Sequence, residues 1–150
     1  MEDTAKFSAL NDELYNWVNN QLLLLIEYAR SLGISLNEPL DPKRMDELWL
    51  VWRNAQANDS DAVDSFLNCF GIGFGQILVN RLGFEWTYME DEYGADIAVR
   101  ALPEIADVRI APLHFVLKRW ESNEGVFIEF SLNEINRVVD ESAREHGVER

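Results

Sequence analysis

The chain has 150 residues, of which 47% are hydrophobic, including five tryptophans and eight phenylalanines; this is enough apolar material for the core of one domain and excludes a disordered chain. Twenty-seven acidic residues against thirteen basic ones give a formal net charge of −14. Because nucleic acids and anionic membranes are bound mainly through Lys and Arg, we expect neither as a partner. The charge suits a basic protein partner, and it also suits a purely solubilising role.

The sequence gives few signals for export or redox chemistry. Its start, Met1-Glu2-Asp3, lacks the basic first part of a signal peptide, and the apolar run at residues 22–26 is too short to span a membrane. Cys69 is the single cysteine, so an internal disulfide is excluded, and its apolar neighbours predict a buried, unreactive thiol. We therefore expect a cytoplasmic protein.

Residues 5–32 are predicted to form a first helix, because leucines and aromatic residues recur there at steps of three and four. Leu22, Leu23 and Ile26 widen its apolar surface beyond one face, so a homodimer that pairs through this helix is one expectation. Asp41-Pro42 predicts the start of a second helix, with Asp as the N-cap and Pro at the first helical position.

A long buried helix is predicted over residues 61–82, with Gly83 just beyond its end. Its N-cap and first-turn residues are Asn58, Asp59, Ser60 and Asp61, which place negative charge near the helix N-terminus. It contains Gly71, Gly73 and Gly75, and each glycine inside a helix costs about 1 kcal/mol relative to alanine. Gly71 and Gly75 are four residues apart and share a face, so we expect another element to approach the backbone closely there. Their spacing matches neither a dinucleotide-binding fingerprint nor a P-loop.

After this helix, apolar residues alternate with polar ones, which is the period of a half-buried strand. A turn is predicted at residues 90–94, where Gly94 suits a positive φ. The residues Ser131-Leu132-Asn133-Glu134 match a capping box that opens a last helix. The predicted strands cover residues 84–88, 97–101, 108–110, 113–120 and 126–130.

These elements predict an α+β fold in a single domain over residues 1–150. Runs of helices followed by runs of strands favour this class over alternating βαβ units. We expect three N-terminal helices, an antiparallel sheet of four or five strands, and a C-terminal helix, with the helices on one face of the sheet.

Several of these segments, taken in order, resemble a known family. They are the pair Gly71 and Gly75, the run LGFEW at residues 82–86, DEYG at residues 91–94 and PLHFVLKR at residues 112–119. Their order is similar to that in domain of unknown function 3806, an uncharacterised bacterial family, over about residues 45–135, with a helical extension before it. The resemblance implies a bacterial source and a small α+β domain, and it brings no catalytic residues.

An acidic cluster is predicted at the tip of the hairpin. Glu90, Asp91 and Glu92 are adjacent there, and Glu85 and Asp96 lie on the strands beside them. The cluster suits binding of a basic partner, although a solvated turn would carry the same residues. The carboxylates are too closely spaced for a calcium loop, whose ligands are spread over about twelve residues.

Arg100 and Lys118 form an alternative candidate site. If both lie on the outer face of the sheet, they could bind an anion. They could equally pair across strands with Asp96 or Glu129, at about 0.2–1 kcal/mol per pair.

The two histidines, His114 and His146, lack the spacing of zinc ligands and stand in no nucleophile motif. We therefore expect no metal, no cofactor and no catalytic residue. The leading hypothesis is a non-enzymatic acidic protein-interaction module, in its most specific form an immunity-type inhibitor of a basic toxin or nuclease. The alternative is a small-molecule or anion-binding domain that uses the outer face of the sheet.

Overall fold

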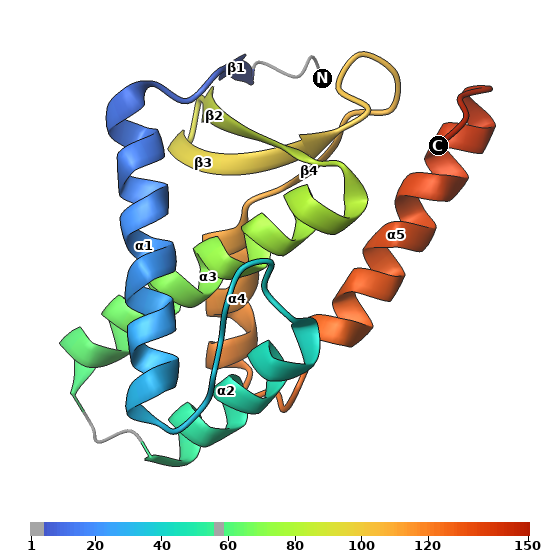
Figure 1. Ribbon diagram of the computed structural model, residues 1–150. Coiled ribbons are helices and arrows are strands. Elements are labelled where there is room, and N and C mark those ends of the chain that lie inside the picture. The colour runs from blue at the N-terminus through green and yellow to red at the C-terminus, as the bar shows by residue number, and fades with distance from the viewer. Residues whose placement is uncertain (1–4, 56–58) are drawn as a thin grey trace.

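The computed structural model describes residues 5–55 and 59–150. Within them, helices and a four-stranded antiparallel sheet of order β1-β2-β3-β4 form an α+β fold, as predicted (Figure 1). The helices are α1 (Asp12–Ser31), α2 (Pro42–Ala55), α3 (Ser60–Leu82), α4 (Pro112–Glu121) and α5 (Ile128–Glu145). The strands are β1 (Lys6–Ser8), β2 (Glu85–Asp91), β3 (Gly94–Ala101) and β4 (Val108–Ile110).

Helix α3 is the centre of the molecule and crosses between α1 and α4 below the sheet (Figure 1). Its predicted ends are confirmed: the Asp59 side chain accepts hydrogen bonds from the first turn, and Gly83 takes the left-handed conformation at φ 73°. Asn58, also predicted near this start, lies outside the described residues. By length and composition α3 could cross a membrane, but 61% of its apolar window is buried inside this fold, as in the core helix of a globular domain.

The three glycines of α3 allow close packing, which confirms the prediction for Gly71 and Gly75. A Cβ atom on Gly71 would lie 3.2 Å from the Cα of Leu113 at the start of α4, and one on Gly75 would lie 2.5 Å from the Trp86 ring. On another face of α3, a Cβ on Gly73 would collide with Leu25 of α1. The cost of the glycines to the helix is therefore offset by contacts that side chains would block.

The strand predicted over residues 113–120 is wrong, because this segment is helix α4. Pro112 occupies the first turn, where its missing N–H costs nothing. The buried residues Pro112 and Val116 are four apart, which is a helical step, whereas Leu117 of the apparent alternation is 39% exposed. The alternating pattern arose because α4 is short and buries side chains on more than one side.

The fifth strand predicted over residues 126–130 is also wrong, because α5 begins at Ile128. Its N-terminal N–H groups are capped from another helix. The carboxylate of Asp46 in α2 accepts hydrogen bonds from the backbone N–H groups of Phe127, Ile128 and Glu129 at 3.0, 2.8 and 3.2 Å. The predicted capping box therefore lies inside the helix, where the N–H of Ser131 donates to the carbonyl of Phe127.

The first helix is shorter than predicted, because residues 6–8 form strand β1 on the edge of the sheet. Asn11 then caps α1, since its side chain accepts from the N–H of Leu14 at 2.8 Å. The β2–β3 hairpin turns through two residues, Glu92 and Tyr93, and Gly94 has the expected positive φ, at 137°. One face of the sheet packs on α3 and α4, and this leaves a groove between the sheet and α1.

Candidate functional site

The acidic hairpin tip comprises Glu90, Asp91 and Glu92, and the structure presents it as predicted. Glu90 and Glu92 are exposed, and the neighbouring Tyr93 is 88% exposed. The Asp91 carboxylate accepts a hydrogen bond from the N–H of Tyr93 at 2.8 Å. Asp91 therefore holds the turn, while the side chains of Glu90 and Glu92 are exposed to solvent.

The other two predicted acidic residues are not part of the tip. Glu85 lies at the opposite end of β2, beside Arg100 in the register, about 20 Å from Asp91 at the rise of a strand. Asp96 is 23% exposed and turns towards α4, where its Oδ2 lies 3.3 Å from Nε2 of His114. Its Oδ1 accepts a hydrogen bond from the N–H of Ile97.

The residues of the alternative anion site do not share a face of the sheet. Lys118 lies on α4, so its predicted place on a strand is wrong. Arg100 is on a strand, but it pairs with Asp107 through Nε at 3.0 Å and Nη2 at 2.8 Å, and not with Asp96. Its guanidinium carbon also lies 3.5 Å from the centre of the Phe7 ring.

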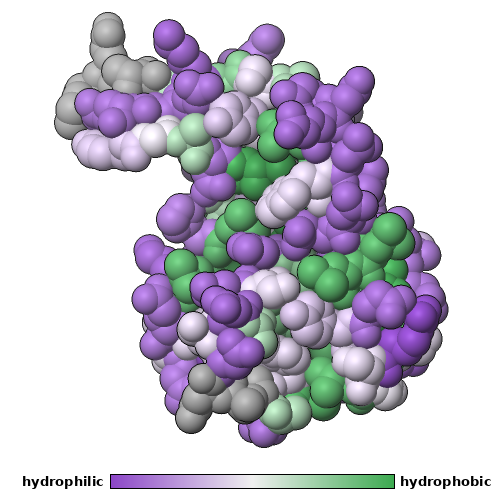
Figure 2. Space-filling view, turned by 90° about the vertical axis from the view of Figure 1, so that its left-hand side faces the viewer, coloured by the Kyte–Doolittle hydropathy of each residue, from purple (hydrophilic) through white to green (hydrophobic). Residues whose placement is uncertain are grey.

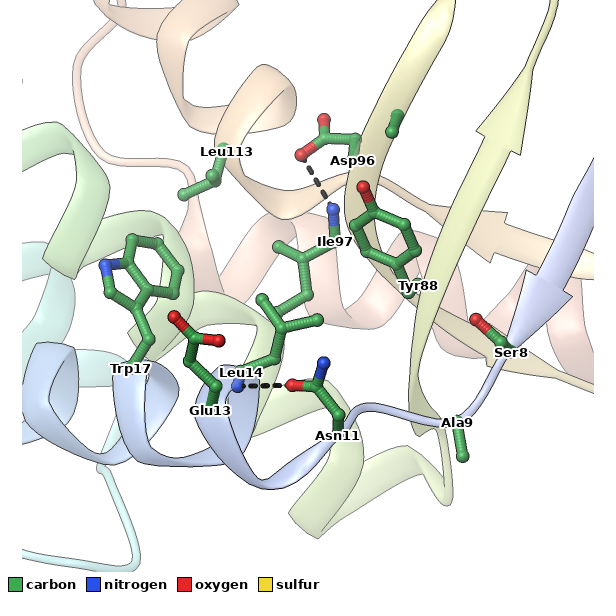
Figure 3. Close-up of a pocket in the computed structure, with 11 residues that line it drawn as sticks. Ser8, Ala9, Asn11, Glu13, Leu14, Trp17, Tyr88, Asp96, Ile97 and Leu113 are labelled. Atoms are coloured by element: carbon green, nitrogen blue, oxygen red, sulfur yellow. Dashed lines mark hydrogen bonds between the residues drawn. The ribbon is translucent and has the colours of Figure 1, made fainter.

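A groove lies between α1 and the strands β2 and β3, and we call it the α1–sheet groove (Figure 3). Its volume is about 680 Å³, within the range of small-ligand sites. It is lined by Ser8, Ala9, Asn11, Glu13, Leu14, Trp17, Tyr88, Ala95, Asp96, Ile97 and Leu113.

The lining of the α1–sheet groove combines aromatic rings with carboxylates. Glu13 and Trp17 are four residues apart on α1 and therefore on the same side of the helix, while Tyr88 and Asp96 come from the two central strands (Figure 3). Two lining residues are acidic, and none is Lys or Arg. The groove therefore favours a cation that also has an apolar or planar part.

A second, smaller hollow of about 420 Å³ lies on the other side of Leu113 and Asp96. Asp64 and His114 line it, and it shares Asp96 with the α1–sheet groove. The two adjoining hollows together are lined by three carboxylates, from Glu13 of α1, Asp64 of α3 and Asp96 of β3.

Ionisable groups deeper in the fold are structural. Burial raises the pKa of Cys69 to about 12, and its thiol donates to the carbonyl of Phe66, which agrees with the predicted unreactive thiol. Burial lowers the pKa of Arg53, whose guanidinium lies over Trp120 and donates to the carbonyl oxygens of Trp120 and Glu124. In residues 5–55 and 59–150, no three His, Cys, Asp or Glu side chains lie close enough to hold a metal.

The sequence analysis missed Glu13, Trp17 and Tyr88 as site residues. Trp17 and Tyr88 belong to regular apolar patterns, in which core packing is the usual role of an aromatic residue. Glu13 belongs to the acidic first turn of a helix, which stabilises many helices without further function. The N-cap at Asn11 was the available signal, since it places Glu13 and Trp17 on α1 close to the sheet.

The side of the molecule along which α1 runs is largely hydrophilic, with separate hydrophobic patches (Figure 2). Leu23 on α1 is 63% exposed, and Tyr15 and Leu24 are also exposed. A homodimer through α1 stays a prediction.

Comparison with solved structures finds a similar fold in a crystal structure of a protein from Bacteroides thetaiotaomicron VPI-5482. The TM-score is 0.64 at 14% sequence identity, and the match covers 85% of this chain and 46% of the other. This chain therefore spans less than half the length of that protein. No curated protein matches the sequence.

The family described as "Domain of unknown function (DUF3806)" matches residues 45–130, which is more than half of the chain. The matched region runs from α2 to the start of α5 and includes the acidic hairpin tip, Asp96 and Tyr88, whereas α1 precedes it. The chain belongs to this family.

Proposed function

We propose that this protein is a non-enzymatic module that binds a positively charged protein partner. In its most specific form it is an immunity-type inhibitor that covers a basic toxin or nuclease. The observation that supports this best is the lining of the α1–sheet groove, which carries two carboxylates from different elements and no Lys or Arg. The exposed Glu90 and Glu92 of the acidic hairpin tip add to it.

The net charge of −14 supports the same proposal. An acidic surface attracts a basic partner over about a Debye length and so raises the association rate, most strongly at low salt. The partner surface of a nuclease is positive because it binds phosphate, and a rigid acidic hairpin would compete for that surface. A hairpin within a sheet orders few residues on binding, which keeps the entropic cost low.

The alternative, an anion-binding domain on the outer face of the sheet, has weaker support. The guanidinium of Arg100 is already paired with Asp107 and stacked on Phe7. Lys118 lies on α4, so the two cations do not converge on one ligand.

The proposal is tested with the hairpin variant Glu90→Lys/Glu92→Lys. Asp91 is left in place because its carboxylate holds the N–H of Tyr93. Wild-type protein is used to capture and identify a partner from native lysate, and association rates are then measured by surface plasmon resonance at low and high salt. We expect slower association of the hairpin variant and a weaker dependence of the rate on salt.

The matched control is Glu145→Lys/Glu149→Lys, which makes the same charge change at exposed residues near the end of α5. It should keep most of the association rate. Equal slowing in both variants would show that the hairpin acts only through the net charge of the protein. Unchanged association rates in the hairpin variant would show that the hairpin is not part of the interface. Circular dichroism checks that each variant is folded.

A further inference from the structure

The α1–sheet groove has a specific arrangement of charged and aromatic groups. Glu13 and Trp17 rise from α1, and Tyr88 and Asp96 face them from the sheet (Figure 3). One carboxylate and one ring thus stand on each side of the groove. Its volume of about 680 Å³ leaves room for a long side chain and the residues next to it.

The polar atoms of the groove keep hydrogen-bonding capacity. Within the described residues, the Glu13 carboxylate, the Trp17 indole N–H and the Tyr88 hydroxyl have no hydrogen-bond partner. Asp96 uses Oδ1 for the N–H of Ile97, and its Oδ2 lies 3.3 Å from His114, whose side chain is 72% exposed. A cation entering the groove would therefore meet acceptors that few internal contacts occupy.

We infer that the α1–sheet groove binds an arginine side chain of the protein partner, with the guanidinium between the Glu13 and Asp96 carboxylates and against the rings of Trp17 and Tyr88. This inference rests on the proposed function and names the residue of the partner that the groove recognises. The main support for this inference is charge complementarity, since the lining holds two acidic residues and no Lys or Arg.

Arginine suits this groove better than lysine does. A guanidinium is planar and stacks on aromatic rings, and its five N–H groups can serve carboxylates on two sides at once. A guanidinium is also more weakly hydrated than an ammonium, so it loses less hydration free energy when it leaves water. A lysine ammonium is compact and would reach one carboxylate well and the other poorly.

The direct test uses a small probe and does not require the partner. Nα-acetyl-arginine amide is titrated into the full chain while tryptophan fluorescence is recorded. Trp17 is the tryptophan that lines the groove, and Trp49 and Trp52 are buried. We expect a saturable change with a dissociation constant of about 1–10 mM, the weak range that suits a single side chain. The Trp17→Phe variant should lose the signal.

Matched variants assign the binding to the groove. Glu13→Gln and Asp96→Asn should each weaken binding at least threefold, and the double variant at least tenfold. Glu85→Gln removes an acidic residue at the far end of β2, outside the groove, and should leave binding unchanged. Glu13 has no hydrogen bond or ion pair within the described residues, whereas Asp96 accepts from the N–H of Ile97, so Glu13→Gln keeps the test decisive even if Asp96→Asn is poorly folded.

Several results would overturn the inference. Nα-acetyl-citrulline amide has the same shape without the charge, and equal binding of it would show that the carboxylates are irrelevant. Equal binding of Nα-acetyl-lysine amide would remove the preference for arginine. The absence of a saturable signal, or an equal loss in Glu85→Gln, would remove the site.

The two proposals fail separately. If the probe binds in the groove and no partner depends on the hairpin tip, the pocket stands and the proposed function falls. If a partner is bound through the hairpin tip and Glu13→Gln/Asp96→Asn binds it with unchanged affinity, the proposed function stands and the arginine pocket falls.

Discussion

Asp46 shows how much of this fold depends on one buried side chain. Its carboxylate accepts three backbone hydrogen bonds at the start of α5, from residues more than eighty positions later in the sequence. Two of the three N–H groups belong to buried residues, Phe127 and Ile128. Without the carboxylate these groups would lose their acceptor in a place that water reaches poorly.

We predict that Asp46→Ala lowers the free energy of unfolding by about 1–3 kcal/mol, or more if α5 separates from the body. Urea denaturation monitored by circular dichroism measures this loss of stability. The midpoint urea concentration should fall, and the slope of the unfolding free energy against urea concentration should stay unchanged. Asp46→Asn keeps one carbonyl oxygen and should lose less. An unchanged midpoint for Asp46→Ala would mean that the cap contributes nothing to stability.

Cys69 yields a prediction on reactivity. Because burial raises the pKa of its thiol to about 12, the folded chain holds almost no thiolate at pH 8. Ellman's reagent should therefore react slowly with the native protein and quickly in guanidinium chloride. Above pH 9 the unfolded chain loses this proton while the folded one keeps it, so the thiol makes stability fall as the pH rises towards 12. Rapid native labelling at pH 8 would contradict the burial.

At the scale of the elements, α3 carries the closest packing. We predict that Gly71→Leu and Gly75→Leu each destabilise the protein by about 1–3 kcal/mol or more, because the new side chain would collide with α4 or with Trp86. This loss should exceed the gain of nearly 1 kcal/mol from replacing a helical glycine. Thermal melting measures the change.

The control for these variants is Gly125→Ala, where an added Cβ meets nothing within 4 Å and the φ is not positive. It should melt like the wild type. If both leucine variants also melt at the wild-type temperature, the close approach of α4 and β2 to α3 does not limit side-chain size.

The elements that the sequence predicted well are those with local signals at both ends. Helix α3 has its Asp59 cap and Gly83, and the hairpin has Gly94. The errors have non-local causes. Helix α5 begins before the predicted capping box because Asp46 caps it from α2. Apolar and polar residues alternate along α4 because α3 and the sheet bury different sides of this helix. Residues 6–8 form a strand only because β2 pairs with them.

At the scale of the whole molecule, the candidate site divides into a part that could be predicted and a part that could not. The acidic hairpin tip is contiguous in sequence, so its carboxylates were visible as a cluster. The α1–sheet groove joins Glu13 and Trp17 to Tyr88 and Asp96, about seventy or more positions apart, and only the packing of α1 brings them together. The groove is also half outside residues 45–130, since α1 precedes the region that matches the family.

The hydrogen bonds between Asp46 and the start of α5 have a consequence for how this domain can evolve. Asp46 lies at the beginning of the family region and residues 127–129 lie at its end, so hydrogen bonds join the two ends of the region. A unit whose two ends lie together tolerates new flanking segments, because neither end must be held by what is attached to it. Helix α1 is such a segment, and it supplies one wall of the groove. Exchange of this one helix would therefore change one wall of the groove and leave the family region in place, so the fold and the lining of the groove can be inherited separately.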